Sequence, residues 1–218
     1  GLYVFAISSL LTAILSVILG IFVWIKNVKG NLNRAWLLLS LSIGIWSFGL
    51  FEEVISLSKA EAFLWTRIFY VGAIFIPIFF LYFVSIFLGA NGLTRKILYI
   101  ASFLSFVFLG LNFTELFIED LAPRYSFPYW NVPGPVFPAF ILYFFMCISY
   151  AHYLLFKYYR KTSGLKRNQI KYFLAASVIA FTGASTDFPL IFNIPVYPFG
   201  HSFILAYPPI IAYAITKY

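Results

Sequence analysis

A few ionisable side chains interrupt the long apolar stretches of this chain, and they are the residues best placed to do chemistry. Glu52 and Glu53 end one apolar stretch, and Arg67 opens the next. Asp187 and His201 stand in the same order near the C-terminus. An ionisable group inside an apolar segment is costly, so it normally has a partner or faces a wet cavity. These acids and bases therefore either pair for stability or bind the polar end of a small molecule.

The predicted ligand-binding set combines these charges with nearby aromatic side chains, because small-molecule sites are mostly apolar with a few polar groups. Adjacent helical residues point about 100° apart, so only one of the two neighbouring glutamates is expected to face inward. For each aromatic residue taken alone, a place in the interface belt or in the core is the alternative. The full set is Glu53, Arg67, Asp187, His201, Glu52, Tyr70, Trp46, Trp65 and Tyr207.

Other kinds of chemistry have little support in the sequence. The single cysteine, Cys147, cannot form an internal disulfide, and with two histidines the chain is poor in metal ligands. A serine hydrolase needs a nucleophile motif, and none accompanies Ser185 and His201. The sequence has no phosphate-binding glycine loop either. We therefore expect no catalysis by this segment and no bound metal or cofactor.

The elements that carry the candidate residues must be membrane-spanning helices. Hydrophobic residues make up 62% of the 218 residues and charged residues only 10%, which is too apolar for a soluble domain with one core. About 20 helical residues span the hydrocarbon layer of a bilayer. The sequence predicts one all-α domain, residues 1–218, with seven spans near 2–25, 35–57, 62–88, 97–114, 136–157, 170–191 and 200–216.

Basic residues are sorted among the connections in the way that membrane topology predicts. Of the 15 Lys and Arg residues, only Lys59, Arg67 and Arg124 lie on the side that carries all 7 acidic residues. The remaining basic residues lie on the opposite side, which the positive-inside rule makes cytoplasmic, so the N-terminus is expected outside. A net charge of +8 arranged in this way suits anionic lipids. Membrane lipids, rather than nucleic acid, are the expected partners.

The candidate site is expected at the outer edge of the hydrocarbon layer, because Arg34 to Glu52 covers about 27 Å of helix. Pro77, Pro208 and Pro209 lie inside predicted spans, where each removes a backbone hydrogen bond of the helix. This favours kinks and a cavity between helices. The connection at 114–137 is rich in proline and aromatic residues. It is expected either to cover the site as a lid or to lie on the interface as a plain loop.

The chain also resembles itself at a shift of 134 residues. The shift places Glu53 on Asp187. It also places Arg67 on His201, so that both halves contain a basic loop, a span ending in an acid and a span opening with a base. With the fourth span as a linker, this is a parallel three-one-three plan, and it favours Glu53 over Glu52 as the inward acid. A chance alignment of two apolar sequences is the alternative.

Four stretches carry a resemblance to a known family: NRAWLLLSLSIGIWSFGL at 33–50, TRIFYVGAIFIPIFFLYF at 66–83, SGLKRNQIKYFL at 163–174 and PFGHSFILAYPPIIAYAITKY at 198–218. They resemble the seven-helix N-terminal sensor region of bacterial and archaeal histidine kinases and related signalling proteins. The resemblance implies a multi-pass protein of a bacterial or archaeal cell membrane. It also implies a cytoplasmic kinase or other output domain after Tyr218, and a homodimer. It supplies no ligand-binding residues.

We therefore expect a transmembrane sensing module that binds a small apolar or amphipathic ligand in an outward-facing cavity and signals to a cytoplasmic output domain. One alternative is a small SWEET-like transporter, which has the same three-one-three plan. A transport site should lie near the midplane, where this sequence is almost entirely apolar. The other alternative is a membrane anchor and dimerisation element.

Overall fold

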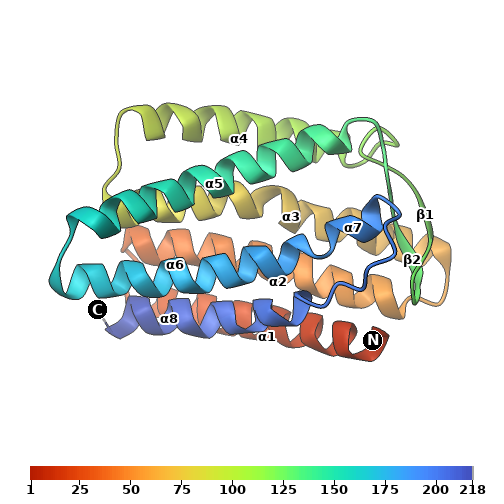
Figure 1. Ribbon diagram of the computed structural model, residues 1–218, viewed down its shortest axis with the longest axis horizontal. Helices are drawn as coiled ribbons and strands as arrows, with labels where there is room; N and C mark the ends of the chain where they lie inside the picture. The colour runs from red at the N-terminus through yellow and green to blue at the C-terminus, as the bar shows by residue number, and fades with distance from the viewer. Residues whose placement is uncertain (218) are drawn as a thin grey trace.

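The computed structural model describes residues 1–217 and consists of long helices with a small hairpin at one end (Figure 1). Within the described residues, six helical segments are long and apolar enough to cross a membrane, with α6 and α7 counted as one. The helices are α1 (Leu2–Lys26), α2 (Asn31–Ile55), α3 (Lys59–Leu88), α4 (Leu93–Leu111), α5 (Phe137–Lys161), α6 (Gly164–Ser185), α7 (Phe188–Ile191), the 3-10 helix η1 (His201–Ala206) and α8 (Tyr207–Lys217).

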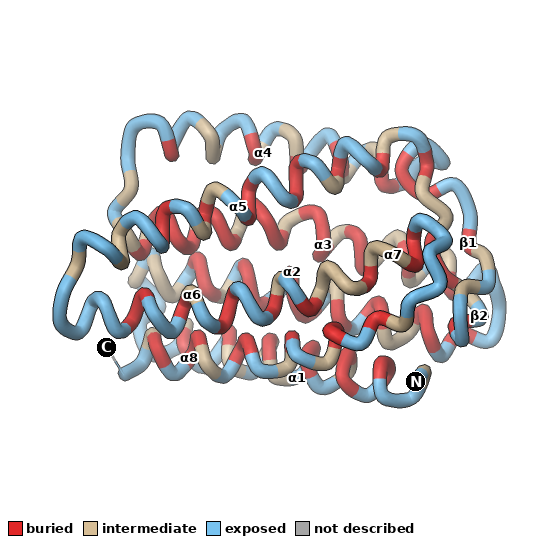
Figure 2. The backbone as a smooth tube through the Cα atoms, viewed as in Figure 1, coloured by how far each residue is buried: buried red, intermediate tan, exposed pale blue. Residues whose placement is uncertain are grey.

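The helices form a closed ring of six segments that includes η1 with α8 and leaves α4 on the outside. Going round the ring, each segment contacts the next in the order α1, α2, α3, α5, α6 and η1 with α8, and α8 returns to α1. α4 packs on the outside against α3 and α5 (Figure 1). Burial follows from these positions: 72% of the most apolar part of α3 is buried but only 22% of that of α4, which is largely pale blue in Figure 2.

The outer surface of the ring suits a lipid environment. Large apolar side chains such as Ile14 and Ile18 on α1 and Phe103 and Phe106 on α4 are exposed. Helices satisfy their backbone hydrogen bonds internally, which is what a segment needs in hydrocarbon. Buried serines face the interior instead, and Ser9, Ser16 and Ser40 are completely covered. Small polar residues at such contacts let neighbouring helices approach closely.

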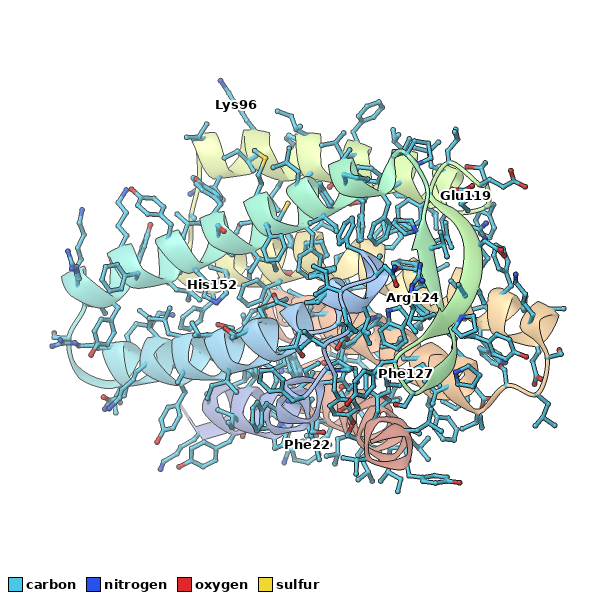
Figure 3. The ribbon with its side chains drawn as sticks, turned by 45° about the vertical axis from the view of Figure 1, so that its right-hand side comes forward. Phe22, Lys96, Glu119, Arg124, Phe127 and His152 are labelled. Atoms are coloured by element: carbon cyan, nitrogen blue, oxygen red, sulfur yellow. The ribbon has the colours of Figure 1, made fainter. Side chains whose placement is uncertain are left out.

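The two ends of the molecule carry different charges. We call one end the basic end: it holds the connections α1 to α2, α3 to α4 and α5 to α6, and the end of α8. We call the other the hairpin end: it holds the N-terminus, the hairpin and α7 (Figure 1). Figure 3 shows Lys96 projecting from the former and Glu119 from the latter. The sorting of charges read from the sequence is therefore present in the fold, while the side that faces the cytoplasm stays a prediction.

The connection at 114–137 corrects the all-α prediction. It contains an antiparallel hairpin of β1 (Ile118–Arg124) and β2 (Phe127–Pro133), with Tyr125 in the turn at a φ of 52°. A segment outside the helices must still find partners for its backbone amides, and strand pairing provides them. The buried ring of Phe127, labelled in Figure 3, packs edge-on at 5.1 Å from the ring of Phe5. The hairpin is therefore a folded cap on the ring, which neither sequence alternative had described.

The last predicted span, 200–216, is helical from His201 to Lys217 but changes type at Tyr207. Pro208 and Pro209 have no backbone N–H, so the carbonyls of Ile204 and Leu205 cannot receive α-type hydrogen bonds. The amide of Tyr207 bonds instead to the carbonyl of Ile204, which is the 3-10 pattern. Six residues at about 2.0 Å and eleven at about 1.5 Å give roughly 28 Å, close to a bilayer core.

The ring has the helix order that a parallel repeat of three helices would give, since α1 to α3 and α5 to α8 occupy matching positions around it. The repeat itself stays a prediction. The paired loop glycines differ in conformation: Gly30 precedes α2 in an extended conformation, whereas Gly164 begins α6 with a φ of 62°.

A close approach between two glycines sets the position of η1 against α6. A Cβ added at Gly183 would lie 2.4 Å from the carbonyl oxygen of Gly200, so only glycine fits. The amide of Gly200 also donates to the hydroxyl of Thr186 at 3.1 Å. Because His201 comes directly after Gly200, this contact determines where its imidazole ring lies.

We predict that Gly183→Ala destabilises the chain by about 1 to 3 kcal/mol, because the new methyl group has to push the backbone of Gly200 away. Gly110→Ala on α4 is the matched control, since a Cβ there meets nothing within 4 Å. The control should be neutral or gain up to about 1 kcal/mol from the better helix propensity of alanine. Thermal unfolding of the purified variants in detergent measures both, and equal midpoints would contradict the prediction.

Candidate functional site

A cavity of about 80 Å³ lies inside the ring near the hairpin end. A water molecule needs only about 10 to 15 Å³ of such space, so the cavity has room for several waters or a small organic molecule. Its walls come from every part of the ring except α1. The lining residues are Ile43, Trp46, Leu50, Phe69, Tyr70, Ala73, Ile76, Trp130, Asn131, Phe140, Phe144, Ala180, Phe181, Ala184, Asp187, Phe188, Ile191, Ile204 and Tyr207.

The cavity wall is mainly apolar, about half of it aromatic, and contains few polar groups. Rings from α2, α3, α5, α6 and α8 surround it, among them Trp46, Tyr70 and Phe140. The polar exceptions are Asn131 from β2 and Asp187 from the turn between α6 and α7, together with the tyrosine hydroxyls. This combination of an apolar container and a few polar groups is typical of small-molecule sites.

The hairpin covers one side of the cavity and is fastened to the ring by Arg67. Trp130 and Asn131 of β2 line the cavity, and both are at least 98% buried. The guanidinium of Arg67 donates to the carbonyl of Ile118 at 2.9 Å and to that of Asn112. The side-chain amide of Asn112 donates back to the carbonyl of Arg67 at 2.8 Å. Arg67 therefore positions the lid and does not face a ligand.

Asp187 is held by a chain of hydrogen bonds that crosses from α6 to α1. Its Oδ2 lies 2.9 Å from Nδ1 of His201, and Nε2 of His201 lies 2.8 Å from the hydroxyl of Ser9. The His201 ring also lies between Phe5 and Trp46, with ring centroids 4.0 and 5.5 Å away. Both ring nitrogens of His201 have a partner and two aromatic rings pack against it, so the imidazole holds Asp187 in one orientation.

The order Ser9, His201, Asp187 is also that of a hydrolase triad, but the surroundings do not suit catalysis. Ser9 is completely buried, and its hydroxyl also lies 2.8 Å from the carbonyl of Phe5. It is not among the residues that line the cavity, so a substrate has no route to it. Ser185 bonds to the carbonyl of Phe181 instead. This hydrogen-bond chain orients a carboxylate.

Several buried polar atoms at the cavity have no hydrogen-bond partner within residues 1–217. They are Oδ1 of Asp187, Oδ1 of Asn131, the hydroxyl of Tyr207 and Nε1 of Trp130. A buried polar group that lacks a partner costs about 1 to 3 kcal/mol. Water or a bound molecule in the cavity would relieve that cost.

The structure brings together four of the nine predicted residues at the cavity: Trp46, Tyr70, Asp187 and Tyr207. His201 lies behind Asp187 as its partner. The single cluster of acids and bases expected from the sequence is not formed, because Arg67 turns toward the carbonyls of Asn112 and Ile118 and has no ion pair with an acid in the described chain.

Glu52, Glu53 and Trp65 do not line the cavity either. Trp65 packs edge-on against Phe48, with ring centroids 5.6 Å apart, on the outer face of α2 and α3. Glu53 is completely buried, as the repeat predicted for the inward acid, whereas Glu52 is partly exposed. No hydrogen bond to either Glu53 oxygen is formed among the described residues. The hydroxyl of Thr66 is close to Glu53 but bonds to the carbonyl of Ala62.

Outside the helices, Lys59 and Asp120 join the start of α3 to β1 through an exposed 2.8 Å ion pair. The hydrogen bond from Lys59 lowers the pKa of Asp120 below its usual value. The ion pair is therefore intact above the ordinary pKa of aspartate and is lost only as the pH falls through the lowered one. The pKa of Tyr197 is raised by partial burial and by nearby Asp187 and Tyr125. Its hydroxyl donates to the carbonyl of Gly1 at 2.7 Å.

The sequence analysis did not predict three residues at or next to the site: Trp130, Asn131 and Ser9. Trp130 and Asn131 come from the unpredicted hairpin, and Ser9 comes from a first span with no charged residue in its outer half. The available signal was the polar Asn131 between aromatic and apolar residues, in a connection already suspected of being a lid.

Comparison with known families supplies independent information. The family model for the N-terminal 7TM region of histidine kinase matches residues 8–218. No curated protein and no solved structure matches the chain. Among residues 1–217, no group of three or more His, Cys, Asp or Glu side chains is placed to hold a metal ion.

We predict that Arg67→Lys loosens the hairpin, because a lysine ammonium cannot reproduce the two-carbonyl contact of the guanidinium fork. Losing one hydrogen bond to a charged donor costs about 1.5 to 3 kcal/mol, so hairpin amides should exchange roughly ten times faster or more. Hydrogen exchange monitored by mass spectrometry measures this. Arg95→Lys at the exposed basic end is the control and should leave the hairpin unchanged. Equal exchange of the hairpin amides in both variants would show that Arg67 does not hold the hairpin in place.

Proposed function

The chain belongs to the family of N-terminal seven-transmembrane regions of histidine kinases, and from this premise we propose that it senses a small molecule bound in the cavity at the hairpin end. Membership makes it a transmembrane sensory module in a multi-pass membrane protein. The identity of the site and its link to the output are our proposal. The homodimer and the bacterial or archaeal origin that the family resemblance implies stay predictions.

One observation carries the proposal: Tyr207, the first residue of α8, lines the cavity. From there α8 continues without interruption to Lys217 at the basic end. A molecule in the cavity therefore touches the same helix that leads to the last described residues. Contact at one end of a stiff helix is a direct physical route to the other.

The 3-10 segment η1 gives this helix a way to exist in two arrangements. A ligand shifts an equilibrium only if it binds two states with different affinity. Ile204 of η1 also lines the cavity. Pro208 and Pro209 keep η1 out of regular α geometry, but tilting or sliding η1 against α6 and α1, which it contacts, would move α8 with it. We propose that occupancy of the cavity biases η1 between such arrangements.

The proposed direction of signalling depends on charge. The positive-inside rule assigns the basic end to the cytoplasm and the hairpin end to the outside. The expected output domain would then continue from α8 on the cytoplasmic side, after Tyr218, which lies outside the described residues. The sensory site would be accessible from the opposite side or from the outer part of the bilayer.

Transport is less well supported, although the ring fits a three-one-three plan. The cavity lies in the hairpin half, and a second opening at the basic end is lined by Phe87, Lys166 and Gln169. Between the two lie the buried side chains of Phe83 and Phe173. The rings of Phe83 and Phe87 both contact that of Phe173, with centroid distances of 5.2 and 4.5 Å. A transporter requires a path on both sides of its site.

We predict that Ala184→Phe, which places a ring in the cavity, changes the basal output of the full-length kinase and removes its response to cavity ligands. Allosteric coupling of about 1 to 3 kcal/mol corresponds to roughly fivefold or more in the measured output. Ala175→Phe is the control, because Ala175 is an exposed residue of α6 outside the cavity.

The measurement is autophosphorylation of the full-length protein in lipid vesicles, with and without benzyl alcohol as the probe. Any effect of the probe on the bilayer is shared by both variants, so only the difference between them reports the cavity. Wild-type basal output and wild-type response in Ala184→Phe would rule the cavity out. If the cavity has no effect on output, the alternative of a membrane anchor and dimerisation element would remain.

A further inference from the structure

The cavity contains hydrogen-bond acceptors that nothing in the described chain satisfies. Oδ1 of Asp187 and Oδ1 of Asn131 are buried without a partner, and their residues are 92% and 98% covered. Resting on the proposed sensory function, we propose that the ligand is a small, mostly apolar molecule whose polar head donates hydrogen bonds, such as a hydroxyl or an ammonium group. An anionic head, or a head that only accepts, would leave both of these acceptor oxygens without a partner.

The orientation of Asp187 leaves one of its oxygens free. Its Oδ2 is occupied by His201, which Ser9 holds from the other side. One carboxylate oxygen is therefore used for positioning, and the other is available at the cavity wall. A carboxylate oxygen accepts hydrogen bonds only, and bonds to charged acceptors are roughly twice as strong as neutral ones.

The second acceptor comes from the lid. Asn131 lies on β2, and Asp187 directly precedes α7, which contacts β2. Both residues line the same cavity, so both acceptors face the same bound molecule. A head that bonds to Asp187 and Asn131 together would join the hairpin to the α6 turn. The hydroxyl of Tyr207, also unpaired within residues 1–217, can donate or accept beside them.

The charge of the lining excludes the opposite kind of ligand. Asp187 is the only charged residue among the lining residues, all of which lie in the described chain. The nearest candidate for an anion partner was Arg67, and its guanidinium is engaged by the carbonyls of Ile118 and Asn112. A buried anionic head would lie next to a carboxylate without a cation to offset its desolvation, and the donors at the wall, such as the Nε1–H of Trp130, are neutral.

The aromatic and aliphatic part of the wall determines which apolar groups the ligand can carry. Aromatic rings such as Trp46, Phe69, Tyr70 and Phe140 line the cavity. They suit a single ring or a short hydrocarbon chain, and aromatic faces also attract an ammonium group. Water alone could also occupy the cavity and bond to the acceptors, and a binding experiment distinguishes water from a ligand.

The test uses five probes that share one ring and differ in the head: benzyl alcohol, benzylamine, methyl benzyl ether, toluene and benzoate. Binding to the purified chain in detergent is measured by calorimetry and by the shift in unfolding temperature. The alcohol and the amine should bind at least about tenfold more tightly than the ether, which has no donor. Benzoate should not bind.

Two variants assign the preference to the two acceptors. Asn131→Leu keeps a similar size and should reduce the difference between the alcohol and the ether, whereas Asn91→Leu at the basic end should leave it unchanged. Asp187→Asn keeps an acceptor but removes the charge, so it should weaken the amine more than the alcohol. Unfolding temperatures near wild type show that each variant is folded.

The outcomes separate this inference from the proposed function. Equal binding of toluene, ether and alcohol would overturn the head-group inference, and so would tightest binding of benzoate. In either case the sensory cavity stands if Ala184→Phe removes the binding. Binding that Ala184→Phe leaves unchanged would place the probes elsewhere and remove both proposals. No binding by any probe would mean water only and overturn the inference.

Discussion

The need to partner a buried acid organises the hairpin half of this molecule. Asp187 lies in an apolar bundle and meets that need through His201, which brings the start of the last helical segment against the end of α6. The two backbones can come that close only because Gly183 and Gly200 have no side chains. Ser9 then ties the pair to α1 and so closes the ring. A single electrostatic requirement therefore determines where three elements meet and which carboxylate oxygen stays free.

Much of the architecture could be predicted because it depends on hydropathy. The predicted span at 2–25 and helix Leu2–Lys26 agree almost residue by residue, and the span at 62–88 lies within Lys59–Leu88. Depth along a helix is also readable from sequence, since rise per residue is constant. That is why Asp187 and His201 could be expected at one level. Depth, however, does not give direction, so the same reasoning wrongly joined Arg67 to the acids, when it bonds to the carbonyls of Asn112 and Ile118.

The features that the sequence could not supply depend on contacts between distant segments. Ser9 is one of several serines in α1, and nothing local distinguishes it as the partner of His201. The hairpin has prolines and charges that weaken any strand signal, so its pairing appears only once the helices fix its ends. By contrast, an irregularity in the last span was predicted, because Pro208 and Pro209 remove donors that regular α geometry would need.

The uninterrupted run of α8 has a consequence for how sensor regions of this kind can be joined to other domains. Anything that continues the helix inherits its rotational phase, and each added residue turns the next face by about 100°. Insertions of seven residues at the junction nearly preserve that phase, while a single inserted residue presents a different face to a neighbouring helix. A helical domain joined to α8 would therefore keep its orientation only if the number of residues at the junction preserved this phase.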